Sequence, residues 1–184
     1  MRVLLLASAF NSLTQRVLAE LGDRGHTVEV ALAVGDRTAR DTAVRDAVRE
    51  HAPDLVLAPM LRTAIPEDVW RARPVLVVHP GPVGDRGPSS LDWAVHEGAE
   101  RWGVTVLQAN AEMDGGDVWA TASCPVPRVG KSDLYRNEVS DAALAAVLLA
   151  VERYASGSYR PVPQSGEGVV PRPYFGQALR RIDW

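Results

Sequence analysis

The sequence holds one cysteine, Cys124, among its 184 residues. A lone cysteine excludes a disulfide within this chain and a zinc cluster built from several thiolates. We expect Cys124 to be a small buried residue near a strand end, because unpaired cysteines behave as small hydrophobic side chains. The dinucleotide-binding pattern Gly-x-Gly-x-x-Gly is also missing from the loop at residues 8–12. A nicotinamide- or flavin-dependent oxidoreductase is therefore the enzyme class that the sequence favours least.

An excess of either charge is equally lacking, since 20 Lys and Arg residues face 23 Asp and Glu residues, for a net charge of -3. Because these charges are dispersed and form no basic stripe, we expect no nucleic-acid partner. No apolar run approaches the roughly 20 residues that cross a bilayer. The apolar run at residues 3–7 is too short for a signal peptide and is typical of a first strand. We expect a cytoplasmic protein with no membrane partner.

What the chain does contain is an alternation of strand and helix patterns, with 46% hydrophobic residues. Apolar runs predict strands at residues 3–7, 27–34, 54–58 and 75–78, and amphipathic spacing predicts helices at 12–24 and 38–50. Residues 103–109 and 118–122 are expected to pair as an antiparallel hairpin around the turn at 110–117. The fold class that follows is α/β, a Rossmann-like, mostly parallel sheet with helices on both faces.

The last helix is predicted over residues 131–157, with Ser132 as N-cap and Gly157 just past its end. Its small and aromatic residues repeat at helical spacing, so we expect that stripe to pack on the sheet. Residues 1–157 would form the domain. Residues 158–184 are rich in proline and show little periodicity, which predicts a tail or linker, with Tyr174, Phe175 and Trp184 as candidate anchors.

The first candidate site residue is His79, which follows the uncharged run at residues 75–78 and precedes a loop rich in glycine and proline. In open parallel sheets ligands bind at the carboxyl ends of strands, so His79 is expected at the edge of a cleft. Beyond this loop, Ser89 or Ser90 is expected to cap a new helix, with Asp92 in capping-box spacing from Ser89.

A second candidate is Asp114, which lies in the turn between the two hairpin strands and is followed by Gly115 and Gly116. Both glycines adopt positive φ readily, which lets the backbone fold the carboxylate inward. We expect Asp114 and His79 to meet at the carboxyl-end edge of the sheet, within direct or one-water hydrogen-bonding reach. Asp117 is interpreted as a turn or surface residue. The loop at residues 59–66 follows another strand at the same edge and suits a flat heterocycle held by main-chain groups.

These motifs together resemble the 10-formyltetrahydrofolate-dependent formyltransferases, which include methionyl-tRNA and glycinamide ribonucleotide formyltransferases. The resemblance rests on His79-Pro80, on Arg86-Gly87 before a helix, on Gly-Val-Thr-Val-x-Gln at 103–108 and on Met-Asp-Gly-Gly-Asp at 113–117. Residues 79–93 and 132–139 resemble more specifically the amino-terminal domain of hydrogenase maturation factors of the HypX type.

The resemblance implies that His79 and Asp114 are catalytic and that no metal is needed. It places the pterin-binding loop at Leu61, Arg62, Thr63 and Ala64, facing the main chain of Ala111, Glu112 and Met113 in one pocket. Further substrate-binding candidates are Pro80, Gly81, Arg86, Asn110 and Asn137.

One position departs from the family pattern. Formyltransferases carry Asn-x-His, and here the asparagine position is Val77. The amide that would hold the formyl oxygen is therefore missing, and Gln108, Asn110 and Asn137 are the candidates to replace it.

Three functions follow from this resemblance. The first is transfer of a formyl group from 10-formyltetrahydrofolate to the thiol of coenzyme A or phosphopantetheine, as the first step of carbon monoxide supply for NiFe hydrogenase maturation. A crotonase-like domain or protein is then the expected partner for the second step. The alternatives are hydrolysis of 10-formyltetrahydrofolate by water and a non-catalytic folate-binding or scaffold module, which Val77 motivates.

Overall fold

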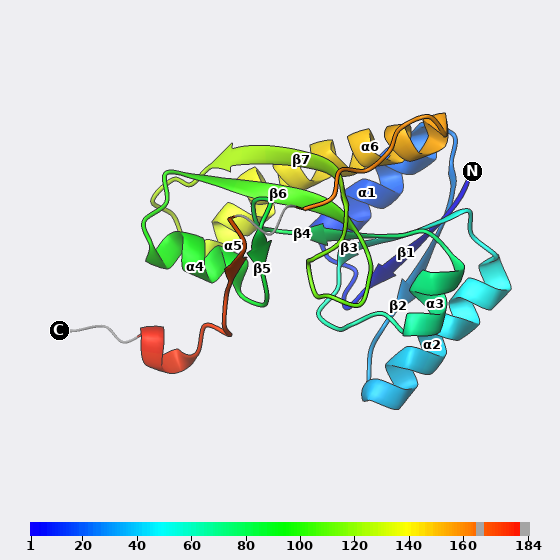
Figure 1. The fold of residues 1–184 in the computed structure, drawn as a ribbon, viewed down its shortest axis with the longest axis horizontal. Coiled ribbons are helices and arrows are strands. Elements are labelled where there is room, and N and C mark those ends of the chain that lie inside the picture. Colours follow the sequence, from blue (N-terminus) through cyan, green and yellow to red (C-terminus); the bar gives the residue numbers. More distant parts are fainter. Residues whose placement is uncertain (165–167, 181–184) are drawn as a thin grey trace.

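The computed structural model describes residues 1–164 and 168–180. Its core is a six-stranded sheet in the order β2-β1-β3-β4-β6-β7 (Figure 1). Four strands run parallel, namely β1 (Arg2–Ala7), β2 (Thr27–Leu32), β3 (Leu55–Met60) and β4 (Val75–His79). The strands β6 (Arg101–Gln108) and β7 (Val118–Pro125) form the expected antiparallel hairpin, and β6 runs antiparallel to β4. The predicted fold class is confirmed.

Helices cover both faces of the sheet. α1 (Ser12–Asp23) and α6 (Ser140–Ser156) pack on one face, whereas α2 (Arg37–His51) and α3 (Glu67–Ala72) pack on the other. Side chains alternate along a strand, so Leu5 joins the first cluster while Leu4 and Leu6 join the second. Burial on both faces explains why these strands are uninterrupted apolar runs.

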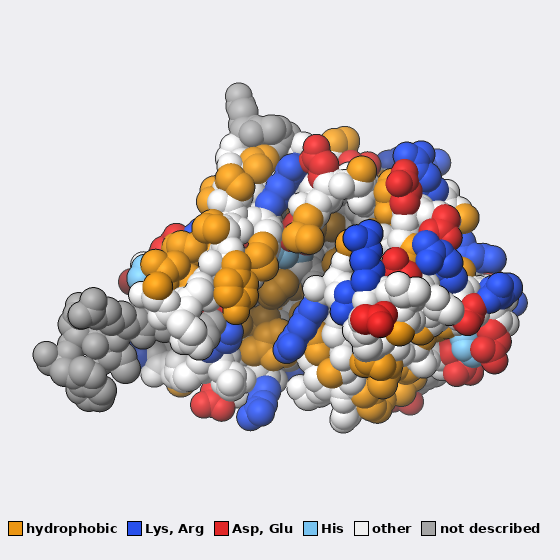
Figure 2. All heavy atoms as spheres, turned by 90° about the horizontal axis from the view of Figure 1, so that it is seen from below, with side chains coloured by type: hydrophobic (Ala, Val, Ile, Leu, Met, Phe, Trp, Pro, Cys, Tyr) orange, Lys and Arg blue, Asp and Glu red, His pale blue; other side chains and the backbone are white. Residues whose placement is uncertain are grey.

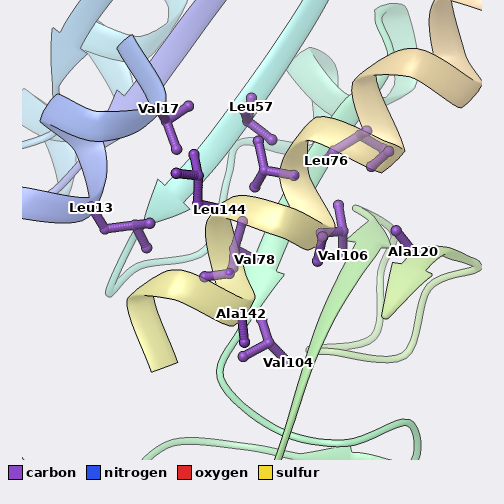
Figure 3. Close-up of a cluster of buried hydrophobic side chains, with 14 of the residues drawn as sticks. Leu13, Val17, Leu57, Leu76, Val78, Val104, Val106, Ala120, Ala142 and Leu144 are labelled. Atoms are coloured by element: carbon purple, nitrogen blue, oxygen red, sulfur yellow. The ribbon is translucent and has the colours of Figure 1, made fainter. Parts of the chain in front are cut away.

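The larger cluster lies between the sheet and α6 (Figure 3). There Ala142 and Leu144 of α6 approach Leu76 and Val78 of β4 and Val104 of β6. Each fully buried Val or Leu stabilises the fold by about 1.5–3 kcal/mol relative to an exposed one. His79 is therefore the last residue of a strand that is largely buried in the core.

The predicted helix at residues 131–157 has a π-helical turn inside it. It consists of α5 (Lys131–Leu134), the π-helical η1 (Tyr135–Val139) and α6. Within this turn the Ser140 hydroxyl donates to the Tyr135 carbonyl oxygen at 2.6 Å, a side-chain bond that competes with the regular helix ladder. The N-cap is Gly130 and not Ser132, whereas Gly157 ends α6 at φ 66° as predicted.

The loop after His79 leads through β5 (Asp85–Arg86) to α4 (Ser90–His96). The predicted capping box is wrong. Ser89 occupies the N-cap position at φ 70° without a side-chain cap bond, and the Ser90 hydroxyl instead donates to the Pro80 carbonyl oxygen at 2.9 Å. Asp92 accepts from the Lys131 ammonium.

Several described residues between 158 and 175 contact the domain. Val162 bridges to Val118, and β8 (Val170–Pro171) pairs with β5. Phe175 is 4% exposed and packs edge-on against Trp93, whereas Tyr174 is 71% exposed. The short 3-10 helix η2 (Gln177–Arg180) follows, and Trp184 lies outside the described residues. The division into a domain at residues 1–157 and a tail or linker at residues 158–184 stays a prediction.

The hairpin turn leaves the sheet at the opposite end from His79, contrary to the expected common edge. In the antiparallel register Leu76 faces Gln108 and His79 faces Thr105, so β6 ends level with the start of β4. Strands rise about 3.3 Å per residue, which puts His79 about 10 Å beyond that level. The turn at 109–117 covers this distance by folding back, since six extended residues reach about 20 Å.

Candidate active site

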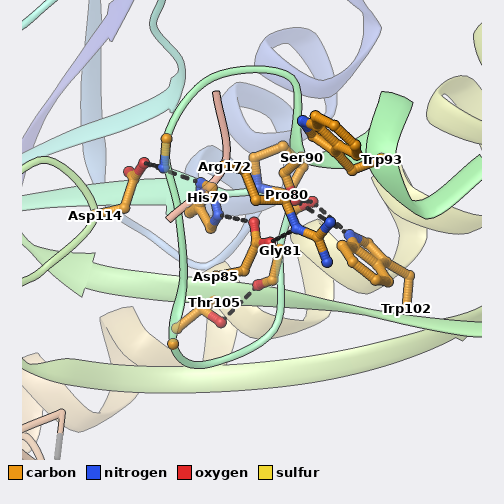
Figure 4. A network of polar contacts seen from close by, with 12 residues as sticks. His79, Pro80, Gly81, Asp85, Ser90, Trp93, Trp102, Thr105, Asp114 and Arg172 are labelled. Atoms are coloured by element: carbon orange, nitrogen blue, oxygen red, sulfur yellow. Dashed lines mark hydrogen bonds and ion pairs between the residues drawn. The ribbon is translucent and has the colours of Figure 1, made fainter. Parts of the chain in front are cut away.

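His79 is buried at the end of β4, with 5% of its surface exposed. Its two ring nitrogens face two different carboxylates (Figure 4). Nε2 lies 2.8 Å from Asp85 Oδ2, and Nδ1 lies 3.4 Å from Asp114 Oδ2. His79 is thus held between β5 on one side and the hairpin turn on the other.

Asp114 reaches His79 through an unusual backbone conformation. It adopts φ 54°, in the left-handed region, and Gly116 packs so tightly that an added Cβ would lie 1.6 Å from the Gln108 carbonyl oxygen. The Gly87 main-chain N–H donates to Asp114 Oδ2 at 3.1 Å and fixes the carboxylate. The expected approach of Asp114 to His79 is therefore present, although the turn reaches it from the other end of the sheet.

Asp85 is a neighbour of His79 that our reasoning from the sequence missed. It is 4% exposed, and its second oxygen, Oδ1, accepts from Arg172 Nε at 2.6 Å. Burial acts to raise the pKa of Asp85, but hydrogen bonds with His79, Ser90 and Arg172 outweigh it and hold the pKa below the ordinary value of 3.8. Asp85 is therefore a buried carboxylate anion at neutral pH.

The signal that could have revealed Asp85 is its position in the loop. It follows His79 by six residues, and Gly81 and Gly84 between them let the chain turn back on itself. An added Cβ at Gly81 would lie 2.3 Å from His79 Nε2 and 2.4 Å from Asp85 Oδ2. Glycine is thus required where the loop passes the two side chains.

Arg86 connects this loop to the hairpin turn. Its Nη1 donates to Glu112 Oε2 at 2.8 Å, while its Nε is buried without a hydrogen-bond partner among the described residues. Ala111 and Met113 of the same turn are exposed, the latter by 62%. One face of the molecule is hollowed, and hydrophobic and Lys or Arg side chains border the hollow (Figure 2).

The predicted pterin loop follows β3 at the carboxyl end of the parallel strands. The Arg62 main-chain N–H donates to the Ser8 hydroxyl at 3.0 Å, and Leu61 packs against the apolar cluster beneath α2 and α3. Thr63 is half-buried, and Ala64 is exposed. A common pocket for this loop and residues 111–113 stays a prediction.

The three amides proposed to replace the family asparagine have hydrogen bonds elsewhere. Asn137 donates to the Asp133 carbonyl oxygen of its own helix, Asn110 accepts from the Glu112 main-chain N–H, and Gln108 accepts from the Trp119 indole. Val77 itself is half-buried and packs with the second apolar cluster. The structure brings none of these three amides into a recorded bond with His79 or Asp114.

Two features are absent from residues 1–164 and 168–180. No group of three or more His, Cys, Asp or Glu side chains there is arranged to hold a metal ion. In the same residues, no helix combines the length and apolar character needed to cross a membrane.

Comparisons with known proteins agree with this geometry. The formyl transferase family model matches residues 33–151. The hydrogenase maturation factor HoxX of Bradyrhizobium diazoefficiens is 51% identical over 186 residues, which cover all of this chain and 32% of that protein. The chain thus spans about a third of the length of this relative.

Solved structures give the same picture. The crystal structure of HypX from Aquifex aeolicus in complex with tetrahydrofolic acid has a TM-score of 0.93 at 43% identity, covering all of this chain and 31% of that one. Glycinamide ribonucleotide transformylase 1 from Symbiobacterium toebii shares the fold, with a TM-score of 0.74 at 20% identity over 90% of this chain and 94% of that one. Since the family model covers more than half of the chain, the protein belongs to the formyl transferase family.

Proposed function

We propose that this chain transfers a formyl group from 10-formyltetrahydrofolate to the thiol of coenzyme A or a similar phosphopantetheine. The observation that carries the proposal is His79, buried at a strand end between two carboxylates, in a chain of the formyl transferase family. The tetrahydrofolic acid complex of the similar HypX structure supports folate as the carrier.

The reaction needs a hydrogen-bond donor for the developing oxyanion and a proton for the leaving nitrogen. The acceptor thiolate attacks the formyl carbon, a C–S bond forms, and negative charge develops on the formyl oxygen. Collapse of this intermediate breaks the C–N10 bond, and the leaving nitrogen takes up a proton. A positioned histidine donates a hydrogen bond to the developing oxyanion, which contributes on the order of 3 kcal/mol in the transition state. The thiol itself has a reference pKa near 8.5, so only modest help from a base is required.

Asp114 supports His79 both as donor to the oxyanion and in the protonation of the leaving nitrogen. Its Oδ2 lies 3.4 Å from His79 Nδ1, near enough to orient the imidazole ring. Because Gly87 also donates to this oxygen, the carboxylate keeps its place without the substrate. The folate ring system would lie against residues 61–64 and 111–113, and the unpaired Arg86 Nε offers a donor beside the turn.

Hydrolysis of 10-formyltetrahydrofolate is the second candidate, and Val77 motivates a third, a folate-binding module without catalysis. Incubating the chain with 10-formyltetrahydrofolate, with and without coenzyme A, distinguishes the three. We expect tetrahydrofolate and formyl-coenzyme A, identified by mass spectrometry, only when coenzyme A is present. Desulfo-coenzyme A, which lacks the thiol, is the matched control and should give no product.

Two other outcomes would each contradict the proposal. Release of tetrahydrofolate at the same rate without coenzyme A would show a hydrolase. Saturable folate binding with no release in any mixture would show a binding module.

The proposed place of this reaction is the first step of carbon monoxide supply for NiFe hydrogenase maturation. The support is the similarity to two hydrogenase maturation factors of about three times this length. We propose that a crotonase-like domain or protein, in the cytoplasm, consumes the formyl thioester.

A further inference from the structure

We propose that Asp85 is a positioning residue for His79 and that Arg172, supplied by the carboxyl-terminal segment, locks Asp85 in place. The proposal rests on the formyl transfer proposed above and assigns a different role to each of the two ring nitrogens of His79. Asp85 would hold Nε2, which leaves Nδ1, beside Asp114, as the nitrogen that faces the substrate.

The two contacts of the ring differ in kind. Nε2 and Asp85 Oδ2 are 2.8 Å apart and form a hydrogen bond, whereas Nδ1 and Asp114 Oδ2 are 3.4 Å apart and form a longer contact that is not a hydrogen bond. Asp114 Oδ2 meanwhile accepts from the Gly87 main-chain N–H. A histidine whose one nitrogen is bound to a fixed carboxylate has a set ring orientation and tautomer, and its other nitrogen is free to act.

Asp85 is fixed through both of its oxygens. Oδ2 binds His79, and Oδ1 accepts from Arg172 Nε at 2.6 Å (Figure 4). The remaining Arg172 donors bind Glu97, and the guanidinium lies 5.7 Å from the ring centre of Trp93. A carboxylate buried this deeply is tolerated only when it is paired. Asp85 therefore remains charged beside His79 because Arg172 pairs with it.

Arg172 is delivered by a strap, here residues 168–175, that crosses the loop after His79. The Val170 N–H donates to the Gly84 carbonyl oxygen at 2.8 Å, and the Arg172 N–H donates to the Arg86 carbonyl oxygen at 2.7 Å. The Trp93 indole donates to the Pro173 carbonyl oxygen at 2.9 Å. Gly87 lies so close that an added Cβ would be 2.3 Å from the Arg172 carbonyl oxygen. The strap is thus built into the site, and its removal would leave Asp85 without its cation.

The test compares Asp85→Asn, Arg172→Gln and Arg172→Lys with the wild-type chain. Asp68→Asn is the matched control, since Asp68 lies on α3 and pairs with Arg45 at the surface. Two readouts are used: steady-state formyl transfer to coenzyme A, and the ring 15N and Nε2–H proton resonances of His79 in 15N-histidine-labelled protein.

For Asp85→Asn and Arg172→Gln we expect kcat to fall about 10- to 100-fold, the size typical of a lost orienting partner, with KM for the folate unchanged. In both variants the downfield Nε2–H signal of His79 should shift or disappear. Arg172→Lys keeps the charge but loses the planar fork, so it should give an intermediate rate. Asp68→Asn should match the wild type in both readouts.

An unchanged His79 signal together with transfer within about threefold of wild type, in both Asp85→Asn and Arg172→Gln, would overturn the proposal. Should Asp85→Asn fail to fold, Arg172→Gln decides alone, because it leaves Asp85 intact. The resonance experiment needs no turnover. A wild type without transfer would therefore refute the proposed function, while the resonances would still decide whether Asp85 holds His79.

Discussion

Replacing Gly81 with alanine is expected to disrupt the contact between His79 and Asp85. The new methyl group would lie 2.3 Å from His79 Nε2 and 2.4 Å from Asp85 Oδ2, about 1 Å short of the 3.4 Å of an ordinary contact. Gly81 is not among the positive-φ glycines of the described residues, so the alanine backbone is unstrained and the effect is steric. Overpacking costs about 1–3 kcal/mol, and loss of a charged hydrogen bond about 1.5–3 kcal/mol. We therefore expect the free energy of unfolding to fall by about 2.5–6 kcal/mol.

Urea unfolding measures that change, and formyl transfer to coenzyme A measures its effect on the site. A displacement of about 1 Å at a catalytic group lowers the rate on the order of a hundredfold. Gly22→Ala is the control, because no atom lies within 4 Å of the added methyl group in α1 and alanine favours a helix by up to about 1 kcal/mol. If Gly81→Ala unfolds and reacts like Gly22→Ala, the described arrangement of His79 and Asp85 is wrong.

Three further predictions concern the same site. Asp114→Asn keeps the shape of the side chain but removes its charge, so kcat should fall about a hundredfold with KM for the folate unchanged; steady-state kinetics would contradict this if KM alone rose. Val77→Asn restores the family amide beside His79 and should raise kcat about tenfold. The amide, placed at a half-buried position, should lower the free energy of unfolding by about 1–3 kcal/mol. A lower rate in the same assay would speak against a missing oxyanion donor. Because the pKa of Asp85 is held below 3.8, its contribution to stability is complete above that pH and is lost as the pH falls through the lowered pKa. Urea unfolding between pH 7 and 3 should therefore show that the free energy of unfolding falls more steeply with falling pH in wild type than in Asp85→Asn. Equal slopes of the free energy of unfolding against pH would refute the assignment.

The fold could be predicted from the sequence because strands buried on both faces are continuous apolar runs. Val75 to Val78 show this directly, since the strand lies between parallel β3 and antiparallel β6. The π-helical turn could not be predicted, because its stretch keeps ordinary helical spacing; in the structure the Ser140 hydroxyl and main-chain N–H both donate to the Tyr135 carbonyl oxygen, five residues back.

Within the site, the approach of Asp114 to His79 could be predicted from local motifs, whereas Asp85 and Arg172 were missed. His79 ends an apolar strand just before a glycine-rich loop, and Asp114 precedes two glycines; their ring nitrogen Nδ1 and carboxylate oxygen Oδ2 lie 3.4 Å apart, and their catalytic role stays a prediction. Arg172 was missed because it follows a proline-rich stretch without periodicity, and its contact with Asp85 joins residues 87 positions apart. The pairing of β8 with β5 helps to bring the two together.

The most direct test of the account is the rate of tetrahydrofolate formation from 10-formyltetrahydrofolate and coenzyme A by wild type and by His79→Ala. His79 Nδ1 lies 3.4 Å from Asp114 Oδ2, and loss of a hydrogen-bond donor to the oxyanion removes on the order of 3 kcal/mol of transition-state stabilisation. We predict that His79→Ala lowers the rate at least a hundredfold while folate binding, measured by titration calorimetry, stays within about twofold. A rate within about threefold of wild type would contradict the claim that this site catalyses formyl transfer.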